Sequence, residues 1–85
     1  MRAIVIYKDM TDYARQVTDY LRDFERQTGR ALETMDPESL PGISFCETYD
    51  ILEYPTIVAL TDSGELLYQW RGLPLPTISE VSYYA

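Results

Sequence analysis

Two short apolar runs with an amphipathic segment between them constrain the fold of this chain most. Residues 3 to 7 form a β-branched run without polar alternation, as in a strand that is covered on both faces. From about residue 11 to 28, apolar side chains recur at spacings of three and four, which predicts a helix that ends at Gly29. Residues 32 to 35 can form a second strand. Because a helical crossover of this length joins parallel strands, the first half predicts a βαβ unit.

The second half predicts an antiparallel pair of strands followed by a short helix. Residues 44 to 51 carry apolar side chains at helical spacing, after an expected loop over residues 40 to 43. Residues 56 to 60 and 65 to 71 flank a glycine-containing hairpin turn. The segment from Thr77 to Glu80 has the pattern of a capping box, which opens a last helix. The sequence therefore predicts an α/β fold with the order β-α-β-α-β-β-α.

Composition excludes several classes of function. The 85 residues are 46% hydrophobic, too apolar for a disordered chain, and no apolar run approaches the roughly 20 residues of a membrane helix. Seven basic and fourteen acidic residues give a net charge of −7, which disfavours nucleic acid and anionic membranes as partners. With one cysteine and no histidine, no internal disulfide, Cys/His zinc site or histidine triad can form. We expect no metal or cofactor, and a cytoplasmic location, since no signal peptide is recognisable.

The stretch Tyr49-x-Ile51-x-x-x-Pro55-Thr56, followed by a strand, a glycine turn and another strand, resembles the C-terminal half of thioredoxins. Together with the element order, it makes nearly the whole chain similar to the thioredoxin/glutaredoxin superfamily, in its compact glutaredoxin-like form. The resemblance implies a single thioredoxin-like domain over residues 1–85. It also implies a mixed four-stranded sheet with strand order 2-1-3-4 and helices on both faces.

The same resemblance implies a candidate site, but the residues at that site lack the cysteines that the family's redox chemistry needs. The family's dithiol motif would fall on residues 11 to 14, Thr-Asp-Tyr-Ala, which contain no cysteine and so cannot exchange disulfides. The Tyr54-Pro55 bond would be cis, and Tyr54 would offer free backbone groups to an extended peptide. We therefore expect a redox-inactive module that binds a protein or peptide, or has a structural role. Its cis-Pro groove would consist of Thr11, Asp12, Tyr13, Tyr54 and Pro55.

Cys46 supports an alternative function. It lies on the apolar stripe that Phe45 and Tyr49 share, where a free cysteine is usually buried packing. A reactive thiol at this position would instead make the chain a one-cysteine thiol redox enzyme, a glutathione-linked oxidoreductase or a redox sensor. No other residue is a candidate for catalysis.

The acidic side chains at the start of the first helix have a structural interpretation. Asp9, Thr11 and Asp12 are expected to cap that helix and to complement its dipole. Asp19 and Asp23 alternate with arginines three and four residues away, as on a solvated helix face.

The aromatic content is high for one small core. The chain has eight tyrosines and Trp70, and four of the tyrosines are expected at or near the surface: Tyr13, Tyr54, Tyr83 and Tyr84. Aromatic side chains of this kind are favoured in protein interfaces, so self-association or a partner surface stays open beside simple partial burial.

Overall fold

Strand β1 (Arg2–Ile6) lies inside a four-stranded sheet in the computed structural model, which describes residues 1–85. It pairs in parallel with β2 (Glu33–Met35) and antiparallel with β3 (Thr56–Leu60), and β4 (Leu66–Arg71) pairs with the other side of β3. The strand order is β2-β1-β3-β4. The predicted mixed sheet with order 2-1-3-4 is therefore confirmed.

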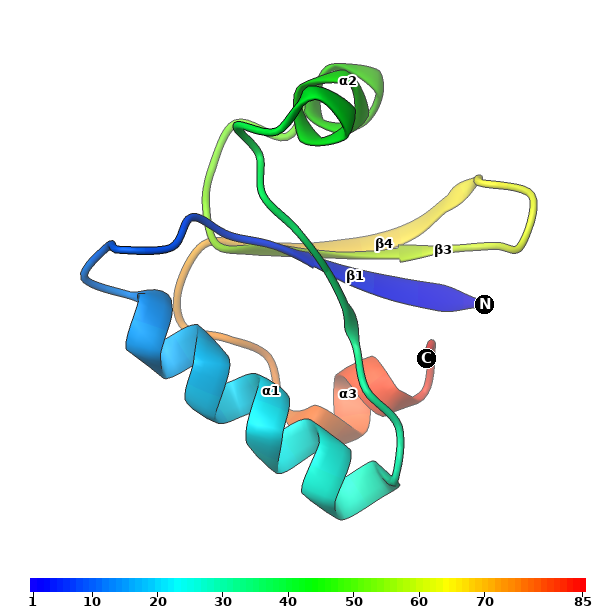
Figure 1. Cartoon of the computed structure of the whole chain (residues 1–85). Helices are drawn as coiled ribbons and strands as arrows, with labels where there is room; N and C mark the ends of the chain where they lie inside the picture. Colours follow the sequence, from blue (N-terminus) through cyan, green and yellow to red (C-terminus); the bar gives the residue numbers. More distant parts are fainter.

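Three helices cover the two faces of this sheet. They are α1 (Ala14–Thr28), α2 (Leu40–Tyr49) and α3 (Ile78–Ser82). Figure 1 shows α2 on one face of the sheet and both α1 and α3 on the other. The predicted α/β class and element order are confirmed. None of the helices is both long and apolar enough to cross a membrane.

The core consists of two apolar layers that share the central strands. Successive residues of β1 and β3 point to opposite faces, so each strand contributes side chains to both layers. The layer under α1 and α3 contains Ala3, Val5, Val17, Phe24, Ile57 and Val81. The layer under α2 contains Ile4, Ile6, Cys46, Ile51, Val58 and Leu60. This double coverage explains why both strands are apolar without alternation.

Helix α1 begins at Ala14, three residues later than the predicted start near residue 11. The predicted capping of this helix by Asp9, Thr11 and Asp12 is wrong, because no side chain caps it. The hydroxyl of Thr11 donates to the carbonyl of Lys8 at 2.8 Å instead. This bond stabilises a turn between β1 and α1. The backbone hydrogen bonds of the helix begin only after this turn. The predicted end at Gly29 is confirmed, with a left-handed φ of 76°.

Helix α2 begins at Leu40, so the predicted loop over residues 40 to 43 is wrong. The Ser39 hydroxyl accepts a hydrogen bond from the Gly42 amide at 3.1 Å and caps the helix. Pro41 lies in the first turn, where an amide hydrogen has no helical partner in any case. At Gly42 an added Cβ would lie 1.8 Å from the carbonyl oxygen of Asp36. Proline and glycine therefore suit the start of this helix.

The predicted capping box of α3 is confirmed. The Thr77 hydroxyl accepts from the Glu80 amide at 3.2 Å, and a carboxylate oxygen of Glu80 accepts from the Thr77 amide at 3.1 Å. These reciprocal bonds fix a helix of only five residues on the face of the sheet that α1 also covers.

Candidate functional site

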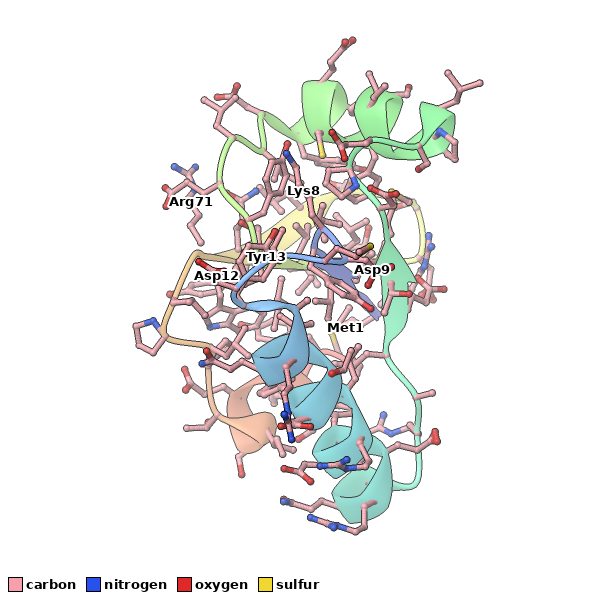
Figure 2. The ribbon with its side chains drawn as sticks, turned by 60° about the vertical axis from the view of Figure 1, so that its left-hand side comes forward. Met1, Lys8, Asp9, Asp12, Tyr13 and Arg71 are labelled. Atoms are coloured by element: carbon pink, nitrogen blue, oxygen red, sulfur yellow. The ribbon has the colours of Figure 1, made fainter.

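Lys8, two residues beyond the end of β1, lies at one corner of the molecule together with three of the predicted groove residues. Its amide donates to the phenol oxygen of Tyr13 at 3.1 Å, and its carbonyl accepts from the Thr11 hydroxyl. Its Nζ lies 5.2 Å from the centre of the Tyr54 ring, a cation–π distance. Figure 2 shows Lys8, Tyr13 and the neighbouring Asp12 at this end of the sheet, between α1 and α2.

Asp12 and Pro55, the other two predicted groove residues, form no contact with Lys8 like those of Thr11, Tyr13 and Tyr54. Asp12 is exposed and forms no ion pair or side-chain hydrogen bond. Pro55 is fully buried, and its carbonyl accepts from the Gly72 amide at 2.8 Å. The peptide bonds that precede Pro55 and Pro74 are both cis. Because Pro55 is covered, a ligand at this corner would contact Tyr54 rather than the proline ring.

The backbone of Tyr54 is unpaired at this corner. The residue lies outside the strands and helices, and neither its amide nor its carbonyl forms a hydrogen bond within the chain. The groups on either side are paired, since the carbonyl of Glu53 accepts from the Thr56 hydroxyl at 2.6 Å and the carbonyl of Pro55 from Gly72. One donor and one acceptor therefore remain for an external strand.

A cavity of about 420 Å³ adjoins Tyr54 on the α2 side of the sheet. Its lining is mainly apolar, with two carboxylates among the wall residues: Pro37, Ile43, Cys46, Glu47, Asp50, Ile51, Leu52 and Tyr54. Tyr54 thus lines this cavity and also contacts Lys8 at the corner that Lys8, Thr11 and Tyr13 form.

Cys46 reaches this cavity from the second turn of α2. Its side chain is free and the residue is only 8% exposed, within the layer formed with Ile4 and Ile6. Burial, and then the neighbouring Cys46 thiol, raise the pKa of Tyr54. The Tyr54 phenol is therefore uncharged at neutral pH.

The positions of the expected dithiol motif form a turn without sulfur. The Ala14 amide donates to the Thr11 carbonyl at 3.2 Å, which brings the two ends of the four-residue segment together. No group of three or more His, Cys, Asp or Glu side chains is arranged to hold a metal ion.

Sequence reasoning missed Lys8 and the cavity. Lys8 is the only lysine of the chain and lies two residues after a buried strand, a signal that could have identified it. The apolar walls at Ile43 and Leu52 gave no such signal, because Ile43 fell in the segment predicted as a loop. Among the expected surface tyrosines, only Tyr83 is largely exposed, at 73%, whereas Tyr13, Tyr54 and Tyr84 are half-buried.

Comparison with solved structures finds the same fold in a thioredoxin. The structure of thioredoxin 1 from the thermophilic eubacterium Thermosipho africanus TCF52B matches with a TM-score of 0.67 and 15% sequence identity, over 99% of this chain and 89% of that chain. No family model and no curated protein sequence matches. At this identity the likeness establishes the fold alone, and it confirms the resemblance inferred from the sequence at that level.

Proposed function

We propose that this chain, whose fold is thioredoxin-like, binds an extended peptide segment of a partner protein at Tyr54 and performs no dithiol chemistry. The observation that carries the proposal is the unpaired amide and carbonyl of Tyr54 beside a mainly apolar cavity of about 420 Å³. In strand addition, backbone hydrogen bonds supply affinity and pockets for side chains supply specificity. Tyr54 and its cavity offer both.

The absence of dithiol chemistry rests on two residues. Thr11 and Ala14 stand where the family pattern has its sulfur atoms, and a threonine hydroxyl neither ionises readily nor forms a mixed disulfide. What this corner retains is therefore a binding or structural role.

The surroundings of Tyr54 favour a peptide with both apolar and basic residues. Ile43 and Leu52 form an apolar wall for one inserted side chain, and the carboxylates of Glu47 and Asp50 border the same cavity. The net charge of −7 adds a long-range attraction for cationic segments. Lys8 opposes this only locally, because its ammonium group already lies over the Tyr54 ring.

Nuclear magnetic resonance titration with the peptide Ac-Lys-Leu-Lys-Leu-Lys-NH2 tests the proposal. We expect a saturable shift of the Tyr54 amide resonance, because this amide gains a hydrogen-bond acceptor. Replacing Leu52 by serine should weaken binding by about fivefold, since it removes apolar contact worth about 1 kcal/mol. Leu40→Ser is the matched control: both leucines are at least 80% exposed, but Leu40 does not line the cavity.

Two results would contradict peptide binding at Tyr54. One is a Tyr54 amide that does not move at saturating peptide, and the other is an equal loss of affinity in the Leu52→Ser and Leu40→Ser variants. The corresponding acidic peptide, with glutamate in place of each lysine, should bind more weakly because the chain repels it.

A thiol function of Cys46 is the second candidate, because this residue lines the same cavity as Tyr54. Alkylation with iodoacetamide separates the two functions. A peptide-binding module with an 8% exposed cysteine should react slowly in the native state and fast in denaturant. Rapid native-state labelling would favour the one-cysteine enzyme or sensor.

A further inference from the structure

A second cavity, of about 250 Å³, lies between β4 and the C-terminal segment and shares no residue with the proposed peptide site. Its walls are four aromatic side chains and one carboxylate: Tyr68, Trp70, Glu80, Tyr83 and Tyr84. It belongs to the face of the sheet that carries α1 and α3, since Trp70 packs against the apolar layer on that face. Figure 1 shows that α2 covers the opposite face.

The four rings form one continuous cluster. The ring centres of Tyr68 and Trp70 are 4.8 Å apart, and those of Trp70 and Tyr84 are 5.6 Å apart in an edge-to-face arrangement. Tyr83 meets Tyr84 edge-to-face at 5.0 Å. Each of the four rings therefore packs against at least one other ring of the cluster, as aromatic side chains favour.

Glu80 gives this aromatic cavity an uncompensated negative charge. One of its carboxylate oxygens accepts from the amide and hydroxyl of Thr77, at 3.1 and 3.0 Å. No arginine, lysine or amino terminus pairs with it, because the four ion pairs of the chain lie elsewhere. A carboxylate held in place beside several aromatic faces attracts a cation through both its charge and the ring quadrupoles.

We propose that this cavity binds the quaternary or methylated ammonium group of an organic cation. Its volume is below the roughly 300 Å³ where sites for drug-sized molecules begin, so it suits a head group of side-chain size. Methylated ammonium spreads its charge over a weakly hydrated surface that fits aromatic walls. A second copy of the chain is disfavoured as occupant, because it carries the same net charge of −7.

Trp70 is the only tryptophan of the chain, so its fluorescence reports on this cavity directly. We expect choline to change the Trp70 emission in a saturable way. The neutral isostere 3,3-dimethyl-1-butanol, with carbon in place of the nitrogen, should bind at least about fivefold more weakly, because it has no cation–π attraction.

Three variants test whether choline binds in the aromatic cavity. Glu80→Gln should weaken choline binding at least about threefold, and it keeps the capping box, because glutamine serves at that position as well. Tyr83→Leu should weaken choline binding by a similar factor. Tyr83 is 73% exposed, so the fold does not depend on its side chain. Glu38→Gln makes the same charge change at an exposed position in the turn that leads into α2, and should leave choline binding unchanged.

Peptides distinguish a free cation from one carried by a protein. The probe is Ac-Ala-Ala-Lys-Ala-Ala-NH2 with a trimethylated lysine, compared with its unmethylated form and with choline. Tighter binding of the trimethylated peptide than of choline assigns the cation to a modified protein, and equal affinities assign it to a small molecule. Both results support an ammonium site.

Equal responses to choline and its neutral isostere, or the absence of saturation, would overturn the proposal. So would a Glu80→Gln variant that binds choline as well as the wild type. A Trp70 emission that changes with protein concentration in the absence of ligand would show that a second copy covers the cavity, which also contradicts it.

Discussion

Tyr20 connects two helices through a group that titrates. Its phenol on α1 lies 3.5 Å from the carbonyl of Thr77, next to α3. Burial, and then the nearby Glu80 carboxylate, raise the pKa of Tyr20 to about 12. Because the folded chain holds this proton more tightly than the unfolded chain does, the stabilising contribution is complete below about pH 10 and is lost as the pH rises towards 12.

We predict that Tyr20→Phe reduces the loss of stability between pH 10 and 12. The difference from the wild type should be about 1 kcal/mol, because solvent reaches part of the side chain and screens the charge. Urea unfolding at several pH values measures it. Identical pH profiles for the two proteins would contradict the buried environment assigned to Tyr20, whereas Tyr83→Phe, at an exposed position, should match the wild type.

At the scale of elements, the start of α2 is the most specific feature of the local structure. Gly42 packs its α-carbon against the carbonyl of Asp36, where an added Cβ would approach to 1.8 Å. Alanine normally stabilises a helix by about 1 kcal/mol relative to glycine. Here the order should reverse, because backbone atoms have to move.

We predict that Gly42→Ala lowers the free energy of unfolding by about 1–3 kcal/mol. Ser44→Ala introduces alanine at an exposed position of the same helix and should be neutral or slightly stabilising. Denaturant unfolding of both variants provides the comparison. A Gly42→Ala protein at least as stable as the wild type would contradict the close packing of residues 36 to 42.

The elements that the sequence predicted best are those with a local cause. The buried strands over residues 2 to 6 and 56 to 60 follow from their apolar composition, and the end of α1 follows from Gly29. The starts of α1 and α2 were misplaced because side-chain hydrogen bonds within the preceding turns decide them. The carbonyl of Lys8 binds the Thr11 hydroxyl, and a turn at Asp36 to Ser39 leads directly into α2.

The candidate site was predictable only in part. The family resemblance pointed to Tyr54 and Pro55, and the structure places Tyr54 beside Tyr13 through Lys8. The adjoining cavity was not predictable, because Ile43 and Leu52 meet only after the chain has folded around α2. For the aromatic cavity, the sequence indicated only an excess of tyrosines and did not show that several of them gather at one place.

At the scale of the whole molecule, the two apolar layers share β1 and β3, so neither can be lost without disrupting the other. We predict a single cooperative unfolding transition, as expected for one domain over residues 1–85. Far-ultraviolet circular dichroism and Trp70 fluorescence should give coincident denaturation curves. Two separate transitions would show that the α2 layer and the α1/α3 layer unfold independently.

The central claim is that a thioredoxin-like scaffold carries a sulfur-free corner at Thr11 and Ala14. Reduction of insulin by dithiothreitol tests it most directly, with the wild type, Cys46→Ser and the double variant Thr11→Cys/Ala14→Cys compared side by side. The turn that joins residues 11 and 14 brings their α-carbons within about 7 Å, a distance that a disulfide can span.

We predict that the wild type and Cys46→Ser leave the rate at that of dithiothreitol alone, and that the double variant accelerates it, because two thiols then occupy the two ends of the turn that leads into α1. Acceleration by the wild type that disappears in Cys46→Ser would contradict the claim, as would a double variant that forms no disulfide and has no activity.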